Sequence, residues 1–525
     1  MKKINSISPT YIALCFAFLF FIQSFTASLN HSLTWDEPTF ISAGYAFLKG
    51  GEFRFNPGHP PLIQFLEAIP LLTMDLRSPS LSYEYWAKWD NPVVALGKTL
   101  IFESGNDPVQ IAFWSRLPIL VLGTLLVFFV FLWGRNLYGA WSALVGTALC
   151  ALCPNLLAHA GLATADMGCT VFFFASCWSF WFAYKKNKIW GWILCGTVAG
   201  LAFISKYTAL VLVPTFIVVA AVDSITHRSR PVVKSWLQAF LIVSVTAFIV
   251  VGLSYGPRPG WGIYLHSLRE INLDNIPGYK WYLLGNFSAT PWKYYALAAF
   301  ALKTSFGSLL LLVIALMTTL KRGDNREDLL FVIFPALMLI IASFFDQTNI
   351  GLRRILPALP LLYLFTSRIM SRIPMRLPYT ALVTVLILWT GVETIRIYPH
   401  HLSYFSAMFG GPLNGPQLLD DSNIDWGQDL PYLARWQRQH PEAGKVRLAY
   451  FGTADPRAYG VDAEPFMMSE GEMLAPLPGT YAISSHLLVG CKLLVPKYGP
   501  RVDWLATYKV RDRAGYSIYI YRFPQ

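Results

Sequence analysis

The sequence predicts an all-α polytopic membrane protein: a bundle of about eleven transmembrane helices followed by a small extracytoplasmic α/β domain. Three observations support this class. Only 14% of the 525 residues are charged, against about a quarter in a soluble chain, and the mean hydropathy is +0.44. Apolar residues come in blocks of about 20, the length that crosses a bilayer core. Beyond about residue 396, charged residues, Gly and Pro become frequent.

The expected spans follow the apolar blocks, and a long polar and aromatic loop separates the first from the second. They lie near residues 10–29, 109–132, 140–157, 167–184, 189–204, 207–222, 236–254, 294–319, 329–345, 355–370 and 377–395. The stretch Pro61 to Met74, in the long loop, is too short to span and is expected at the membrane interface. The first block resembles a cleaved signal peptide in part, but its length and the spans that follow favour an uncleaved helix.

Short loops carry most of the basic residues, which predicts their side of the membrane. By the positive-inside rule these loops and the N-terminus are cytoplasmic: Lys2, Lys3, Arg135, Lys185, Lys186, Lys188, Arg228, Arg230, Lys234, Lys321, Arg322, Arg326, Arg368, Arg372 and Arg376. The opposite loops are longer and richer in Trp, Tyr, Pro and acids. An odd number of spans then puts the C-terminus outside. The same distribution explains the net charge of +12 without nucleic acid, because no basic, aromatic-interleaved face is present.

The chain therefore divides into a transmembrane domain, 1–395 with its long outer loop 30–108, and a soluble extracytoplasmic domain, 396–525. In the second domain three segments read as strands and Leu430 to Gln439 as a helix. The strands are expected at Lys445 to Phe451, Thr480 to Ser484 and Tyr516 to Phe523.

No metal or other cofactor is predicted. The seven cysteines form neither a disulfide framework nor a zinc-site spacing, and most lie in apolar segments where small thiols pack between helices. In the C-terminal region Asp421, Asn423 and Asp425 alternate as in a calcium loop, but Trp426 and Tyr432 stand where that pattern needs Gly and Glu. A polar turn or a sugar-contacting loop is the favoured interpretation.

Two adjacent carboxylates, Asp36 and Glu37, follow the first span at the outer membrane face. A carboxylate there can act as a general base on an acceptor hydroxyl, with its neighbour as helper. The competing interpretation is that Asp36 only caps the helix from Pro38 to Leu48, and composition alone favours the cap.

Further charged or titratable groups recur at the outer ends of other spans. Asp166 begins the fourth span, and Lys206 lies at a tight outer turn, where it either faces a partner or extends to the interface. Arg353 and Arg354 offer bidentate forks for a phosphate or serve as interfacial anchors. His59 donates to a phosphate or sugar oxygen, or is an ordinary loop histidine.

Taken together, these elements resemble membrane glycosyltransferases that use polyprenyl-phosphate sugars, the group of protein O-mannosyltransferases and the lipid A aminoarabinose transferase, which share the GT-C fold. The resemblance covers about residues 1–395, and order and sidedness make it specific. It is carried by the acid pair Asp36 and Glu37, the element His59 to Leu62, Thr-x-Asp ending at Asp166, Gly200 to Lys206, and Arg353 to Pro357. The family often has Lys where His59 stands, which implies a pH dependence of any phosphate contact.

The resemblance implies an enzyme of the cytoplasmic (inner) membrane that moves a hexosyl or pentosyl group, with inversion, from a polyprenyl-phosphate donor to a hydroxyl at the outer face. Asp36 would be the general base, and Glu37 and Asp166 would orient it or the sugar. His59, Lys206, Arg353 and Arg354 would bind the donor phosphate. The acceptor would be a lipid, glycan or protein, and membrane lipids the surroundings. The alternatives are a transporter or lipid flippase, whose charges would lie near mid-span, and a non-catalytic assembly subunit.

Overall fold

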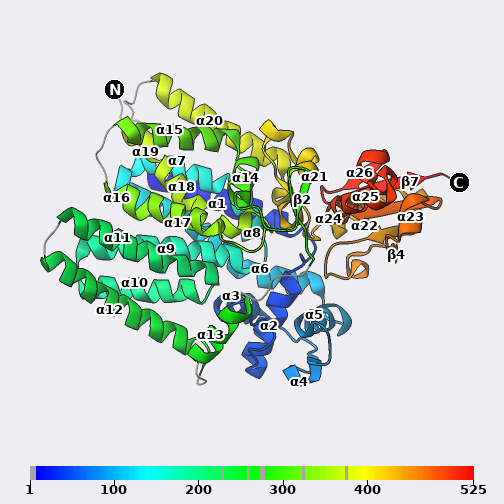
Figure 1. Ribbon diagram of the computed structural model, residues 1–525, viewed down its shortest axis with the longest axis horizontal. Coiled ribbons are helices and arrows are strands. Elements are labelled where there is room, and N and C mark those ends of the chain that lie inside the picture. Colours follow the sequence, from blue (N-terminus) through cyan, green and yellow to red (C-terminus); the bar gives the residue numbers. More distant parts are fainter. Residues whose placement is uncertain are drawn as a thin grey trace.

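The computed structural model describes residues 8–227, 230–256, 260–271, 278–321, 326–372 and 377–524. Five of the basic residues predicted to face the cytoplasm, Lys2, Lys3, Arg228, Arg322 and Arg376, lie outside these ranges. The chain forms a bundle of long helices, with a smaller helix and sheet region at one end and the N-terminus at the other (Figure 1).

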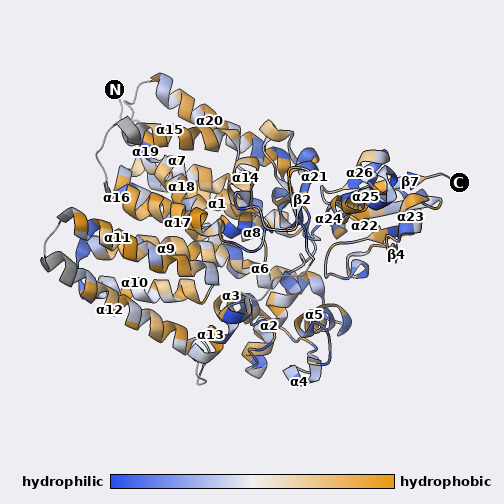
Figure 2. Cartoon of the chain, in the orientation of Figure 1, coloured by the Kyte–Doolittle hydropathy of each residue, from blue (hydrophilic) through white to orange (hydrophobic). Residues whose placement is uncertain are grey.

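The bundle is built from α1 (Pro9–Ser28), α6 (Pro108–Tyr138), α7 (Ala140–Ala151), α8 (Pro154–Ala160), α9 (Ala165–Lys186), α10 (Ile189–Phe203), α11 (Leu212–His227), α12 (Arg230–Leu253), α14 (Tyr295–Leu302), α15 (Phe306–Lys321), α16 (Arg326–Asp328), α17 (Phe334–Ser343), α18 (Ala358–Thr366), α19 (Arg368–Arg372) and α20 (Leu377–Ile397). Apolar residues cover these helices, whereas polar residues are frequent in the region at the C-terminal end (Figure 2).

Helix length supports fewer continuous spans than the sequence predicts. Within the described ranges six helices are long and apolar enough to cross a membrane, or eight if each of two bent pairs is one span. The pairs are α7 with α8, bent by 63°, and α14 with α15, bent by 117°. The expected spans at 189–204 and 329–345 are shorter apolar helices of the ranges Ile189–Phe203 and Leu329–Ser343.

The bend between α7 and α8 has a local cause. Pro154 is the first residue of α8, and proline disfavours helical backbone in the residue before it. Asn155, next in α8, donates its side-chain amide to the backbone carbonyl of Lys303 at 2.6 Å, and Lys303 lies at the break between α14 and α15. The two bent pairs therefore meet at their breaks.

The segment between α1 and α6 folds over the end of the bundle that faces the C-terminal region (Figure 1). It holds α2 (Glu37–Gly50), α3 (Pro61–Ala68), α4 (Tyr83–Trp86) and α5 (Pro92–Lys98), and α13 (Gly260–Ile271) lies nearby (Figure 1). The helix α3 with the turn that follows is a short apolar element, as expected of Pro61 to Met74. Gly44 allows α2 and α3 to meet, because a Cβ there would collide with the carbonyl oxygen of Gln64.

The C-terminal region contains a mixed five-stranded sheet of order β4-β3-β5-β7-β6. Strand β3 runs parallel to β4 and β5, and β7 runs antiparallel to β5 and β6. The elements are α21 (Gly415–Leu418), α22 (Leu430–Gln439), β3 (Val446–Ala449), β4 (Ala463–Pro465), α23 (Glu470–Leu474), β5 (Gly479–Ser484), α24 (Ser485–Cys491), α25 (Val495–Tyr498), α26 (Trp504–Thr507), β6 (Asp512–Ala514) and β7 (Ile518–Phe523).

The three predicted strands are confirmed as β3, β5 and β7, and the predicted helix as α22. The sequence missed β4, β6 and the hairpin of β1 (Trp281–Leu283) and β2 (Asn286–Ser288). Each of these strands has three residues, which is too short for an alternating pattern to emerge.

Backbone hydrogen bonds join the loop after α1 to the segment before α22. The amide of Ser32 donates to the carbonyl of Gln428 at 3.0 Å, and the amide of Trp35 donates to the carbonyl of Trp426 at 2.9 Å. This junction fixes the start of α2 against the C-terminal region.

Candidate active site

Four of the predicted site residues form one chain of ion pairs at the end of the bundle that faces the C-terminal region. Arg353 Nη1 lies 2.9 Å from Asp36 Oδ2 and 3.8 Å from Asp166 Oδ2. Lys206 Nζ lies 2.5 Å from Asp166 Oδ1. Residues from α2, α9, the α10–α11 turn and the segment before α18 are thereby brought together from distant parts of the sequence.

Of the two carboxylates in the ion-pair chain, Asp36 is the more exposed to solvent. Its side chain is 27% exposed, against 2% for Asp166. It occupies the N-cap position of α2 but makes no side-chain cap bond, so the capping interpretation favoured by composition is wrong. The carboxylate binds Arg353 through Oδ2 instead, and among the described residues its Oδ1 has no hydrogen-bond partner.

Glu37 points into a different cluster, although it follows Asp36 directly. Its two carboxylate oxygens accept two bonds from Arg116, each 2.7 Å long. They also accept the backbone and hydroxyl of Thr34 and the amide of Ala163. Burial raises the pKa of Glu37, but the Arg116 pair and these donors outweigh it and hold the pKa below its usual value. Glu37 is fully buried, and its acceptor positions are occupied.

Arg353 packs against an aromatic ring in addition to pairing with carboxylates. Its guanidinium carbon lies 4.2 Å from the ring centroid of Trp426, a cation–π contact that fixes the plane of the fork. Its side chain is only 11% exposed. Arg354, by contrast, hydrogen-bonds Thr348 and lies 3.5 Å from Asp346, so the two arginines predicted as a pair have different partners.

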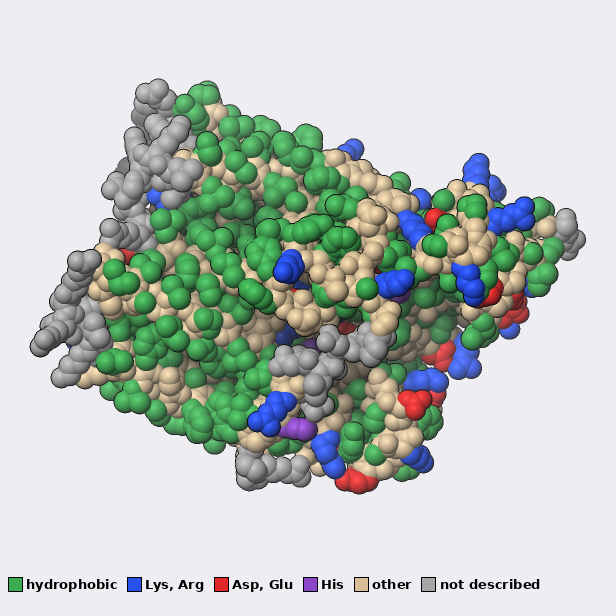
Figure 3. Space-filling view, viewed as in Figure 1, with side chains coloured by type: hydrophobic (Ala, Val, Ile, Leu, Met, Phe, Trp, Pro, Cys, Tyr) green, Lys and Arg blue, Asp and Glu red, His purple; other side chains and the backbone are tan. Residues whose placement is uncertain are grey.

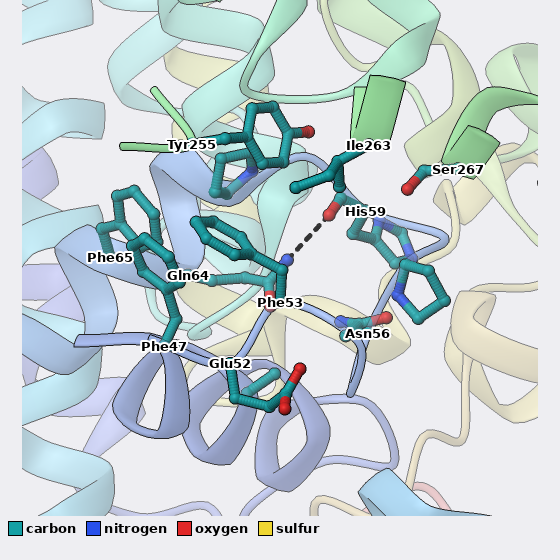
Figure 4. A pocket seen from close by; sticks show the side chains of 14 residues that line it. Phe47, Glu52, Phe53, Asn56, His59, Gln64, Phe65, Tyr255, Ile263 and Ser267 are labelled. Carbon is teal, nitrogen blue, oxygen red and sulfur yellow. Dashed lines mark hydrogen bonds between the residues drawn. The ribbon is translucent and has the colours of Figure 1, made fainter. Parts of the chain in front are cut away.

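His59 lies beside the ion-pair chain and lines a pocket. Burial, and after it the charge of Lys206, lowers the pKa of His59 to about 3, so its imidazole is neutral at physiological pH. The pH dependence expected from the sequence is therefore shifted below that range. Its Nδ1 is buried without a hydrogen-bond partner among the described residues, whereas its carbonyl accepts the side chain of Gln64 at 2.9 Å (Figure 4).

The pocket at His59 is polar on one side and aromatic on the other. Asn56, Glu52 and Ser267 contribute the polar groups, and Phe47 and Phe53 lie opposite (Figure 4). Glu52, Phe53 and Ser267 also line a wider cavity of about 620 Å³ against α13. His59 lines this pocket, whereas the four members of the ion-pair chain do not.

Sequence reasoning missed several residues around the site. Arg116 was hidden in an apolar span, although a charge there signals a partner. Glu67 of α3 is fully buried, and both its carboxylate oxygens lack a partner among the described residues. Burial raises the pKa of Glu67 well above its usual value, with smaller contributions from Glu37 and Asp166. Glu67 is therefore a buried acid with a raised pKa next to the site, and its place in the apolar stretch from Pro61 to Met74 was the available signal.

The C-terminal polar loop contacts the segment that carries Arg353. The Asn423 side chain accepts the amide of Leu352 at 3.2 Å and donates to Tyr295. Asp425 accepts the amides of Gly427 and His486. The alternating polar side chains thus serve separate protein partners.

Part of the chain matches a known protein family. Residues 99–254, from the end of α5 to α12, match the family model described as dolichyl-phosphate-mannose-protein mannosyltransferase. This part of the chain is therefore similar to a glycosyltransferase family. This finding disfavours the transporter and the non-catalytic subunit. A search of curated proteins returned no match to this chain.

Among solved structures, ArnT from Cupriavidus metallidurans in the apo state is similar at a TM-score of 0.51 and 12% identity, covering 97% of each chain. The same ArnT bound to undecaprenyl phosphate gives a TM-score of 0.48 and 13% identity, covering 97% of the present chain and 98% of the ArnT chain. An oligosaccharyltransferase from Archaeoglobus fulgidus gives 0.45 and 11%, covering 83% and 58%. The similarity to apo ArnT, with a TM-score of 0.51, establishes the fold. Together with the apolar helices, this fold makes the chain an integral membrane protein.

Proposed function

We propose that the enzyme transfers a sugar from a polyprenyl-phosphate donor to an acceptor hydroxyl, with inversion at the anomeric carbon, on the extracytoplasmic side of the cytoplasmic membrane. The observation that carries the proposal is the ion-pair chain from Asp36 through Arg353 and Asp166 to Lys206. The matched family is named for a lipid-phosphate sugar donor, and this chain supplies the charges that such a donor needs.

Lys206 and Arg353 are the proposed phosphate ligands. As the glycosidic bond breaks, negative charge develops on the leaving phosphate, and cations held in place beforehand stabilise that charge. Asp166 binds both cations and is a positioning residue in this scheme. Arg354 pairs with Asp346 outside the ion-pair chain, so we expect it to contribute less to phosphate binding. His59, neutral at physiological pH, would offer a hydrogen bond rather than a charge.

Asp36 is the proposed general base. It would take the proton of the acceptor hydroxyl while the hydroxyl oxygen bonds to the anomeric carbon and the polyprenyl phosphate leaves. A general base must lie within hydrogen-bond reach of that proton. Asp36 is the solvent-exposed carboxylate of the ion-pair chain. Glu37, originally expected to assist, is assigned a structural role because its acceptor positions are filled.

The proposed topology puts the ion-pair chain outside. The ends of α9 and α11 and the starts of α10 and α12 lie at the bundle end away from the C-terminal region (Figure 1), and Lys185 and Lys186 stand at the end of α9. With this end cytoplasmic, residues 30–108 and 396–525 are extracytoplasmic, and eleven crossings remain the proposed count. The charged side chains in Figure 3 gather over the same outer end.

The function is tested by incubating the purified enzyme with a panel of polyprenyl-phosphate hexoses and pentoses and an extract of envelope lipids and glycans. Release of free polyprenyl phosphate that depends on acceptor supports the proposal. The stereochemistry of the product tests inversion. If protein shown to be folded consumed no donor of the panel, the proposed function would be contradicted.

A further inference from the structure

Outside the ion-pair chain, three titratable side chains converge at the junction between the bundle and the C-terminal region. They are His31 in the loop after α1, His400 after α20, and Asp429 before α22. His31 Nε2 lies 3.8 Å and His400 Nδ1 lies 3.4 Å from the same oxygen, Asp429 Oδ1. We propose that these three residues bind a divalent first-row metal ion, Zn²⁺ first among them.

All three inward-facing atoms are buried and lack a hydrogen-bond partner among the described residues. The side chain of Asp429 is fully buried, and those of His31 and His400 are 10% and 12% exposed. Leaving three such groups without partners is costly. The 3.4 Å separation is also long for a charge-assisted hydrogen bond, which is about 2.7–2.9 Å. A shared ion would satisfy all three at once.

The distances suit a small ion. A tetrahedral Zn²⁺ lies about 2.0–2.2 Å from nitrogen and oxygen ligands, which puts the ligand atoms about 3.3–3.6 Å apart. The three atoms here lie within 4.8 Å of one another, so a small inward movement completes the site. Two imidazoles with one carboxylate suit Zn²⁺ rather than Ca²⁺ or Mg²⁺, which prefer oxygen ligands.

The carboxylate of Asp429 is oriented by a dedicated cradle. Its Oδ2 accepts the amides of Tyr516 and Ser517, both at 3.0 Å, and the hydroxyl of Ser517 at 2.9 Å. Gly515 has φ +62°, and a Cβ there would collide with Asp429. These bonds turn Oδ1 toward the two histidines, as outer hydrogen bonds do at metal sites.

The histidines are held as well. Tyr432 packs on His400, with ring centroids 4.4 Å apart, and on His31 at 5.8 Å. The backbone carbonyl of His31 accepts Arg116 Nη1 at 3.1 Å. The proposed ion would therefore fasten the loop after α1 and the loop after α20 to the C-terminal region, next to the backbone bonds that fix the start of α2. This inference does not depend on the proposed reaction.

The test uses the full-length protein in detergent and measures metal rather than activity. Chelator-stripped protein is given Zn²⁺, desalted and analysed by elemental mass spectrometry. We expect about one Zn²⁺ per chain, lost in His400→Gln and His31→Gln and kept in His440→Gln, a half-buried histidine of the same region. Gln can donate to Asp429 but is a poor Zn²⁺ ligand, so it separates a metal site from a hydrogen-bond network.

Thermal unfolding gives the second measurement. Zn²⁺ should raise the Tm of the wild-type protein and of His440→Gln, and leave His400→Gln unchanged, while Mg²⁺ has no effect. Wild-type protein that retains no Zn²⁺ and shows no rise in Tm would overturn the proposal, even if the variants fail to fold. Equal Zn²⁺ retention by wild type and His400→Gln would do the same.

Discussion

Asp36 and Glu37 are neighbours in sequence, and both pair with an arginine, but the two ion-pair clusters are built differently. The cluster of Glu37 and Arg116 is closed: side-chain exposures are 0% and 4%, and the carboxylate accepts several donors. The cluster of Asp36 and Arg353 is partly open, at 27% and 11%. A sealed and saturated pair stabilises a fold, whereas an open pair with spare acceptor capacity can exchange partners with a substrate. Four predictions test this distinction.

The largest effect is expected at Asp36. Asp36→Asn removes the proposed base but keeps the shape, so sugar transfer should fall roughly 10²–10⁴-fold with little change in Tm. The measurement is transfer rate in membranes with equal amounts of folded enzyme. Asp90→Asn, at an exposed position of the same outer segment, serves as the control. Activity of Asp36→Asn within a few-fold of wild type would remove Asp36 from the catalytic machinery.

The sealed pair should respond in stability instead. Arg116→Ala leaves Glu37 buried without its counter-charge, which costs about 3–5 kcal/mol, so the yield of folded protein and its Tm should both drop. Glu103→Gln breaks an exposed pair with Lys98 and should cost no more than about 1 kcal/mol. If Arg116→Ala folded normally and lost only turnover, the contrast between the clusters would be mistaken.

The phosphate ligands should show an intermediate effect. Lys206→Ala removes one charge-assisted contact, worth about 1.5–3 kcal/mol, and should lower kcat/KM for the donor about 10- to 150-fold. Pairing it with Asp166→Asn restores charge balance, which separates lost donor binding from misfolding. Arg354→Ala should have a smaller effect than Arg353→Ala, because Arg354 pairs with Asp346. Equal donor kinetics for all these variants would contradict the assignment.

The smallest effect concerns pH. Burial lowers the pKa of His59 to about 3, below the usual value near 6.5. Between these two pH values the imidazole is protonated in the unfolded chain and neutral in the folded chain. Stability from this group is complete above about pH 6.5 and is lost as the pH falls toward 3. His59→Gln should make the fall of Tm in acid shallower, whereas donor KM should stay flat between pH 6 and 8. An unchanged slope in the variant would show that His59 is not held neutral.

The sequence predicted the parts of the site that depend on local position. Asp36, Asp166, Lys206 and Arg353 each follow or precede an apolar block, and sidedness alone brings them to one face. The pairing of Glu37 was not predicted, because its partner Arg116 is 79 residues away. The orientation of a carboxylate is decided by such distant donors, which no local pattern reports.

The C-terminal contribution and the membrane crossings were harder to predict for physical reasons. Trp426 was considered only as a mismatch in a calcium pattern, whereas packing against Arg353 gives it its role. The bends at Pro154 and beyond Leu302 divide apolar blocks that hydropathy reads as continuous. Hydropathy reports the number of apolar residues in a segment. It does not report where the backbone breaks, and these breaks determine the direction of each helix.

The sequence separation of the two clusters also has a consequence for biosynthesis. Glu37 meets Arg116 after 79 further residues, but Asp36 meets Arg353 only after 317. At about 5–20 residues per second, the first pair is available within about 4–16 s of Glu37 being made, and the second only after about 16–63 s. The ribosome therefore delivers the sealed anchor while most of the bundle is still unmade, whereas the proposed active site cannot form until about two thirds of the 525 residues have been made.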